Sequence, residues 1–241
     1  MDPIYKRPTK ICVHWPDVYE YKYNLIILDE NKKKRYYRGD TMTSFKYTND
    51  HFIKVIAKQI VESNDDTYKN SSMLYELSMQ INKFAKLYHT IGNMINVPSY
   101  FNCQRSGKGK YDFWDLVMQK IKEWYKLKDE AEKRKEPLKT LLDPVGENRD
   151  LEQSINCCEE WLSHFEKWND FVKDNYLGVF IKRENGKLQV DNDGEFESIV
   201  FWENHSHENP EFPNDKDTFL KYLKSLNEMI EQRNEIIIKQ F

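Results

Sequence analysis

Residues 88–107, YHTIGNMINVPSYFNCQRSG, contain side chains that can bind an anion. Arg105 offers a forked guanidinium, Ser106 a hydroxyl group, and Asn93 and Asn102 both donors and acceptors of hydrogen bonds. Glycines precede and follow these residues, and a glycine lets the backbone approach a ligand closely. The segment leads into a helix expected to begin at Asp112, and helix N-termini attract anions. The pattern therefore predicts a site for a phosphate or another oxyanion.

The same segment has a second interpretation, as a connection between two helices whose polar side chains hydrogen-bond buried backbone groups. Asp112 already places a negative charge at the N-terminus of the following helix. The spacing of the glycines matches neither a Walker loop nor a dinucleotide-binding motif. The sequence leaves both interpretations open.

The C-terminal sequence QRNEIIIKQF places two polar residues on or beside an apolar helix face. Arg233 follows Leu226 by seven residues, and Asn234 follows Ile230 by four. A buried guanidinium needs a partner, because an uncompensated buried charge is strongly destabilising. We expect a carboxylate, a cluster of backbone carbonyls or a ligand anion. The carboxylates considered are those of Asp40, Asp112 and Asp115. Helical ribonucleases place a His after a similar Arg-Asn pair, but EIIIKQF contains none, which argues against that activity.

His205 and His207 form an H-x-H pair close to Glu203 and Glu208. Such a cluster can ligate a metal, but it lies in a polar sequence and no other residue supports it. We therefore predict a solvated loop and no metal site. DNDGE at 191–195 lacks the full calcium-loop spacing and is predicted to be a turn. No cofactor motif is found, and no cofactor is predicted.

Composition and charge narrow the class of protein. The net charge of −3, from 37 Lys and Arg against 40 Asp and Glu, does not indicate bulk nucleic-acid binding. The four Cys lack CxxC spacing, which favours a reducing compartment over a zinc site. We find neither a signal peptide nor an apolar run of membrane-spanning length. We therefore expect a cytoplasmic protein without a membrane partner.

Hydrophobic periodicity predicts an α+β fold: a helix-dominated single domain, residues 1–241, with a small antiparallel β part. The expected parts are, in chain order, a β-rich 1–48, a helical 49–176, a β-hairpin plus strand at 178–202 and a C-terminal helix at 215–241. Within the first part, strands are expected at 10–15, 22–28 and 33–38. The hairpin prediction depends on its Asn185-Gly186 turn, a strong short-range signal.

Apolar residues within the helical part recur at helical spacing in four segments, at 52–61, 74–87, 113–124 and 151–176. Residues 62–72 are predicted to be a polar break, and residues 137–148 a short linker. Gly92 fits a position just after a helix end or a close backbone approach. The apolar face of the last helix is expected to comprise Phe219, Leu223, Leu226, Ile230 and Ile237.

Five segments occur in an order that resembles a bacterial family described only as a domain of unknown function. They are GDTMTSFKYT (39–48), TIGNMINVP (90–98), FNCQRSGKGKYDFWDLVMQKIKEWY (101–125), WLSHFEKWNDFVKDNYL (161–177) and IEQRNEII (230–237). The family pattern runs D-T/S, T-I-G-x-M-x-x-x-P, N-x-x-R with D-x-x-D-L, a long aromatic helix, and E-x-R-N. The first 37 residues find no counterpart, and KDEAEKRKE departs from the pattern as an insertion.

The resemblance implies no activity, but it selects a set of polar positions. These are Asp40, Thr90, Asn93, Asn102, Arg105, Asp112, Asp115, Arg233 and Asn234. They overlap the residues chosen above for their chemistry.

The sequence supports three classes of function. The first is binding of an anionic ligand, either a nucleotide-like molecule or a nucleic-acid backbone, by Asn93, Asn102, Arg105, Ser106, Arg233 and Asn234. By association with other uncharacterised bacterial and phage-borne families, we expect a role in defence or counter-defence. The second is an enzyme acting on a phosphoryl or nucleic-acid substrate, with Asp112, Asp115 or a His as the acid–base group. The third is a protein-interaction module, such as an inhibitor, with an aromatic and mixed-charge surface.

Structure can distinguish these three classes. A deep pocket with a perturbed carboxylate or His favours the enzyme. A pocket lined only by Arg and Asn favours ligand binding. A filled core together with an exposed aromatic patch favours the interaction module.

Overall fold

The computed structural model describes residues 26–28, 34–63, 67–98, 100–101, 113–144 and 146–240. It has the helix-dominated α+β fold that the sequence predicted. The helices are α2 (Phe45–His51), α3 (Lys58–Glu62), α4 (Thr67–Leu87), α5 (Trp114–Lys126), α6 (Lys135–Leu142), α7 (Leu151–Leu162), α8 (Trp168–Asp174) and α9 (Lys216–Ile238). A π-helical stretch, η1 (Phe52–Ala57), joins α2 to α3, and 3-10 turns form η2 (Ile91–Asn93) and η3 (Gly178–Phe180).

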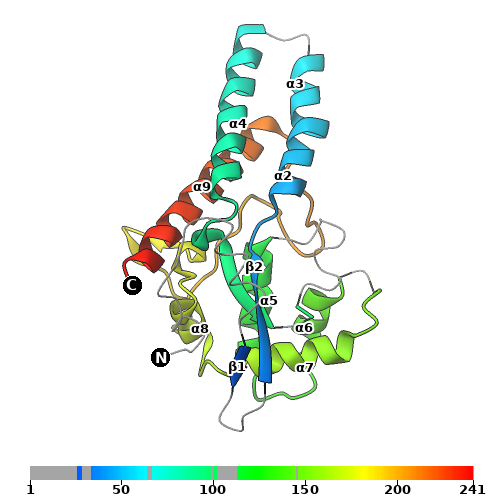
Figure 1. The fold of residues 1–241 in the computed structure, drawn as a ribbon, viewed down its shortest axis with the longest axis vertical. Coiled ribbons are helices and arrows are strands. Elements are labelled where there is room, and N and C mark those ends of the chain that lie inside the picture. The colour runs from blue at the N-terminus through cyan, green and yellow to red at the C-terminus, as the bar shows by residue number, and fades with distance from the viewer. Residues whose placement is uncertain are drawn as a thin grey trace.

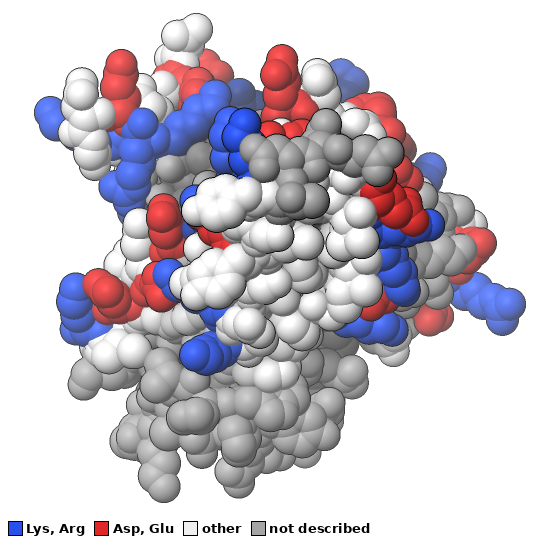
Figure 2. Space-filling model, turned by 90° about the horizontal axis from the view of Figure 1, so that it is seen from above, with Lys and Arg blue, Asp and Glu red and all other residues white. Residues whose placement is uncertain are grey.

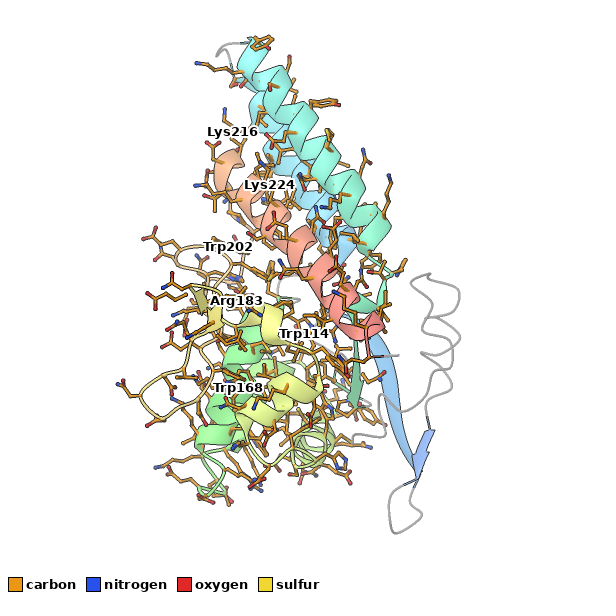
Figure 3. All side chains as sticks on the ribbon, turned by 90° about the vertical axis from the view of Figure 1, so that its left-hand side faces the viewer. Trp114, Trp168, Arg183, Trp202, Lys216 and Lys224 are labelled. Atoms are coloured by element: carbon orange, nitrogen blue, oxygen red, sulfur yellow. The ribbon has the colours of Figure 1, made fainter. Side chains whose placement is uncertain are left out.

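The molecule divides into a projecting helical hairpin and a body (Figure 1). The arm α2–η1–α3 and the arm α4 form the hairpin at the top of the view, and α5 to α8 lie in the body below. Helix α9 packs against α4 and also reaches η2 and η3. It thereby joins the hairpin to the body, and Figure 3 shows it beside α4 with Lys216 and Lys224 labelled.

An antiparallel sheet in the order β1-β2-β3 comprises β1 (Ile26–Leu28), β2 (Lys34–Thr41) and β3 (Met94–Pro98). Strand β2 pairs with β3 so that Asp40 lies opposite Ile95. The connection between two helices that was considered for 88–107 therefore contains a strand, at 94–98, that the sequence did not predict. All five residues of β3 are buried. Four of them are apolar and one is Asn96, and a short, mostly apolar run is consistent with a buried strand. The strand predicted at 10–15 lies outside the described residues.

The hairpin and α9 share one hydrophobic core. The first arm buries Phe52, Ile56 and Ile60, which recur every four residues and so lie along one side of the helix. Ile53 and Val61, predicted on the same face, are 55% and 71% exposed because each lies one residue beyond a buried position. On α4 the buried residues are Leu77, Ile81 and Phe84. The predicted face of α9 is buried throughout, at Phe219, Leu223, Leu226, Ile230 and Ile237.

Helix α4 begins at Thr67, inside the segment 62–72 that was predicted to be a polar break. Its first turns are rich in hydroxyl and aromatic side chains, which obscured the helical pattern in the sequence. Helix α5 buries Phe113, Val117, Ile121 and Trp124 as predicted. The first half of the predicted linker at 137–148 instead belongs to α6, because Leu138, Leu141 and Leu142 form a buried face.

The predicted helix at 151–176 is two helices, α7 and α8, separated by a turn at residues 163–167. Phe165 in this turn is still buried, so the hydrophobic period continues although the helix does not. The Leu162 carbonyl at the end of α7 accepts a hydrogen bond from the Tyr125 hydroxyl at 2.7 Å. This bond satisfies one of the carbonyls that a helix end leaves free.

The Asn185-Gly186 turn of the hairpin predicted within 178–202 is confirmed. Strands β4 (Arg183–Glu184) and β5 (Lys187–Leu188) are antiparallel, and Asn185 and Gly186 have φ values of 50° and 78°, as this turn type requires. The strand predicted after it forms only isolated bridges, such as Val190 with Phe196. Helix α9 begins as predicted, with Asp215 accepting hydrogen bonds from the Asp217 and Thr218 amides.

Candidate functional site

Arg233 lies at the centre of a buried polar cluster that also contains Thr90, Asn93 and Asn234, here called the Arg233 cluster. The guanidinium is 0% exposed. Its Nη1 donates to the carbonyls of Ile91, Gly92 and Met94 at 3.1, 3.0 and 2.6 Å. Its Nε and Nη2 donate to the carbonyls of Tyr176 and Asn175 at 3.1 and 3.0 Å. The sequence analysis expected a carboxylate, a cluster of backbone carbonyls or a ligand anion as the partner of Arg233. These hydrogen bonds show that backbone carbonyls are its partners.

The two asparagines of the Arg233 cluster also bind backbone. Asn234 accepts a hydrogen bond from the Gly92 amide at 2.5 Å and donates to the Thr90 hydroxyl at 2.9 Å. Asn93, 0% exposed, donates to the carbonyls of Thr43 and Tyr88 and accepts from the Thr43 amide. Segments that lie more than a hundred residues apart in the chain are thus joined around η2.

Gly92 is needed because α9 approaches the backbone at this point. A Cβ atom on residue 92 would collide with the Ile230 carbonyl oxygen and lie 2.9 Å from Cγ of Asn234. The close approach of backbone predicted for this glycine is therefore confirmed. A larger residue would force η2 away from Asn234 and Arg233.

The structure brings together three of the six predicted ligand-binding residues, Asn93, Arg233 and Asn234. The other three, Asn102, Arg105 and Ser106, lie outside the described residues, as does Asp112. All three are buried and hydrogen-bond the protein's own backbone, and Asn234 also donates to the Thr90 hydroxyl. Anion binding by the 102–106 segment stays a prediction.

Asp115 and His205 form a second buried polar pair that the sequence did not predict. Asp115 Oδ2 lies 2.7 Å from His205 Nδ1 and accepts a hydrogen bond from the Phe201 amide at 3.0 Å. Trp202 stacks on the imidazole with a ring-centroid distance of 3.8 Å, and Phe113 contacts it edge-on. Neither side chain of the pair is exposed, so the predicted solvated loop is wrong at His205. Asp115 was considered as an acid–base group; in the structure its hydrogen bonds to His205 and Phe201 join the 201–205 loop to α5.

His207 is also held within the fold, with Nε2 3.0 Å from the Leu116 carbonyl oxygen. Burial lowers the pKa of this imidazole from its usual value. Among the described residues, no group of three or more His, Cys, Asp or Glu is arranged to hold a metal ion. Both histidines of the H-x-H sequence therefore form contacts within the fold.

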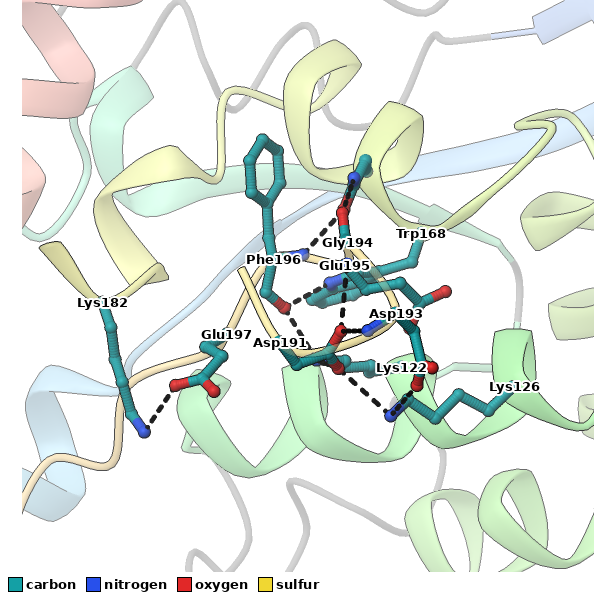
Figure 4. A network of polar contacts seen from close by, with 11 residues as sticks. Lys122, Lys126, Trp168, Lys182, Asp191, Asp193, Gly194, Glu195, Phe196 and Glu197 are labelled. Atoms are coloured by element: carbon teal, nitrogen blue, oxygen red, sulfur yellow. Dashed lines mark hydrogen bonds and ion pairs between the residues drawn. The ribbon is translucent and has the colours of Figure 1, made fainter. Parts of the chain in front are cut away.

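The DNDG turn is confirmed and forms an ion-pair network with α5 (Figure 4). Asp191 Oδ2 lies 2.8 Å from Lys122 Nζ and 3.2 Å from Lys126 Nζ. Its Oδ1 accepts hydrogen bonds from the Asp193 and Glu195 amides. The Lys122 ammonium, together with these amides and Lys126, holds the pKa of the Asp191 carboxyl well below its usual range. Lys122 and Lys126 of α5 are therefore paired within the protein.

The outward face of α4 differs from these enclosed clusters. Residues 68, 72, 75, 79, 82 and 86 lie within one stripe at 100° per residue, on the side of α4 opposite its buried residues Leu77, Ile81 and Phe84. We call this stripe the α4 face. It consists of Tyr68, Ser72, Tyr75, Met79, Asn82 and Lys86. Tyr68, Tyr75 and Met79 are 82%, 69% and 52% exposed, and the other three are exposed as well.

The first arm of the same hairpin provides a comparison. Its outward side has the exposed Val61 and four charged residues, Asp50, Lys54, Lys58 and Glu62, which form the pairs Lys54–Asp50 and Lys58–Glu62 at 2.9 and 3.9 Å. Such charged stripes are usual on the solvent side of a helix. The α4 face instead contains no carboxylate and a single lysine.

Charges beside the α4 face are neutralised between α4 and α9. Lys224 pairs with Glu76, and Lys83 Nζ lies 2.8 Å from Glu231 Oε2. Figure 2 views the molecule from the hairpin end: uncharged residues (white) occupy the middle of the view, and charged residues lie to both sides and above them. The tips of the two tyrosines can hydrogen-bond, while their rings offer large apolar area.

Comparison of the chain with protein-family models, with curated proteins and with solved structures gave no match. In the part of the chain that the structure describes, no helix is both long and apolar enough to cross a membrane.

Proposed function

We propose that this protein is a protein-interaction module that binds its partner through the α4 face. The observation that carries the proposal is the exposure of Tyr68, Tyr75 and Met79 on one stripe of a projecting helix. Tyr and Met are enriched in the central parts of protein interfaces, whereas Lys, Glu and Asp are depleted there. The buried polar groups support the same choice, because the Arg233 cluster is occupied by the protein's own backbone.

The composition of the face is suited to recognition. Tyrosine supplies a large, rigid contact area with little loss of side-chain entropy, and serine and asparagine supply adaptable hydrogen bonds. Methionine adjusts its shape to a partner. On α4 these types alternate along one stripe, at residues 68, 72, 75, 79 and 82. A helix presented in this way fits a groove or another helix.

Site-specific photo-crosslinking tests the proposal. A benzophenone amino acid replaces Tyr75 in the full chain, expressed in the cells that make the protein. Ultraviolet light should give a discrete covalent adduct heavier than the 29.2 kDa chain. The adduct should be suppressed by the additional change Met79→Glu, which places a charge inside the contact.

The matched control places the same amino acid at Ile238, which is 45% exposed near the end of α9 and lies outside the α4 face. This position should give no discrete adduct. The absence of an adduct from residue 75, or identical adducts from both positions, would contradict the proposed function.

A further inference from the structure

We infer that the occupant of the α4 face is α4 of a second copy of this chain, packed antiparallel about a two-fold axis. The inference rests on the proposed function and identifies the partner. Two-fold dimers are the commonest homo-oligomers, and each copy in them contributes the same patch. The α4 face must therefore be complementary to itself, and its sequence allows this to be examined residue by residue.

An antiparallel pairing centred on residue 77 places residue i opposite residue 154 − i of the second copy. Tyr75 then faces the second copy's Met79, a contact between a sulfur and an aromatic ring that is favourable. Ser72 faces Asn82, which allows a hydrogen bond between a hydroxyl and an amide. The third pair is Tyr68 with the second copy's Lys86, so each of the six residues of the stripe has a partner in this register.

The charges of the face agree with the same register. Lys86, the single charge of the face, lies opposite the second copy's Tyr68, where its ammonium can sit over the ring in a cation–π contact. A parallel pairing would place Lys86 against Lys86. Among the flanking residues, Glu76 and Lys83 fall opposite Ser78 and Ser71, so that no like charges meet. Charge complementarity therefore selects the antiparallel arrangement.

The shape of the molecule permits this arrangement. The hairpin projects beyond the body (Figure 1), and the buried side of α4 faces away from the stripe. Antiparallel packing of two hairpins places the two bodies at opposite ends of the contact. The contact involves one helix from each copy, which is at the small end of specific interfaces. We expect a dissociation constant on the order of micromolar.

Cysteine pairing tests the register. Tyr75→Cys and Met79→Cys are prepared separately in the full chain and then mixed under mild oxidation. In the inferred register these two positions face each other, and a disulfide needs Cα atoms within about 7 Å. The mixture should form several-fold more disulfide-linked dimer than either variant alone.

The control mixes Tyr68→Cys with Met79→Cys. Residue 68 faces residue 86, seven positions from 79, which is about 10 Å along a helix. This pair should give no more cross-linked dimer than the unmodified protein, whose own cysteines set the background. Equal yields from both mixtures would overturn the register.

Sedimentation velocity tests the association itself, from about 1 μM to about 100 μM, a range that brackets micromolar binding. The wild-type chain should shift from monomer to dimer. Met79→Glu acts twice in each symmetric dimer and should raise the dissociation constant at least tenfold, while Ile238→Glu should leave it within twofold. A wild-type chain that stays monomeric throughout would overturn the inference. A photo-crosslinked adduct of a mass other than twice 29.2 kDa would then preserve the proposed function with a different partner.

Discussion

Replacing Arg233 tests whether its hydrogen bonds to backbone carbonyls stabilise the fold. The side chain is 0% exposed and donates to five backbone carbonyls, those of Asn175, Tyr176, Ile91, Gly92 and Met94. Arg233→Ala leaves these acceptors without their donor and opens a cavity. Each unsatisfied buried group costs about 1–3 kcal/mol, and water entering the cavity recovers part of that loss. We expect a loss of about 4 kcal/mol, a large part of the 5–15 kcal/mol typical of a folded domain.

The conservative variant Arg233→Lys refines this estimate. An ammonium keeps the charge but offers three donors in place of the guanidinium's five, so we expect a loss of about 2 kcal/mol. Arg183→Ala is the matched control, because Arg183 is exposed and donates a single hydrogen bond to the Gly186 carbonyl. Its effect should stay within about 0.5 kcal/mol.

Urea denaturation followed by tryptophan fluorescence and circular dichroism measures these changes. Hydrogen exchange provides a local measurement, since Arg233→Lys should increase exchange around residues 91–94 and 175–176. If Arg233→Ala lowered the free energy of unfolding by less than about 1 kcal/mol, as a surface substitution ordinarily does, the stabilising role of Arg233 would be refuted. Such a result would also restore Arg233 as a candidate ligand contact.

Three further changes probe the other structural groups. Gly92→Ala forces a Cβ atom into α9 and should destabilise the fold by about 1–3 kcal/mol or more in urea denaturation. Gly178→Ala, where the nearest atoms to the added Cβ lie 4.0 Å away, should be nearly neutral in the same measurement. Asp115→Ala removes the acceptor for His205 and should cost about 3–5 kcal/mol in urea unfolding; a loss under about 1 kcal/mol would show that the pair contributes little. Because the pKa of Asp191 is lowered in the folded state, its stabilisation is complete above the unfolded value of about 3.9 and is lost as the pH falls through the folded value. The melting temperatures of wild type and Asp191→Asn should therefore differ by a constant amount from about pH 5 to about pH 8, and the difference should shrink progressively as the pH falls below about 4. A difference that stays undiminished as the pH falls would contradict this.

The sequence predicted α9 and its buried arginine because both follow from the period of the helix. The seven-residue spacing from Leu226 placed Arg233 on the apolar face, and the structure buries it there. The sequence could not show which carbonyls Arg233 would bind, because every residue has a backbone carbonyl whatever its type. The strand at 94–98 was missed although four of the five residues of MINVP are apolar. There the neighbouring Gly and Asn residues drew attention to loop chemistry.

Contacts between distant segments left no local pattern. Asp115 and His205 are 90 residues apart in the sequence, and neither spacing nor composition joins them. The break between α7 and α8 was hidden because Phe165, in the turn, keeps the hydrophobic period. The α4 face was assigned in part to a polar break, since Tyr and Ser residues fit both a loop and the exposed side of a helix. Only the position of the buried residues on the opposite side makes it a surface stripe.

Hydroxyl-radical footprinting of Tyr68, Tyr75 and Met79 tests the central claim, that the α4 face is an association surface, most directly. The three side chains should react fast in dilute purified protein, as their exposure requires. At high concentration, or in extracts of the native cells, their oxidation should fall several-fold, while that of the half-buried Tyr176 stays constant. Equal oxidation of the three residues under all of these conditions would contradict the claim.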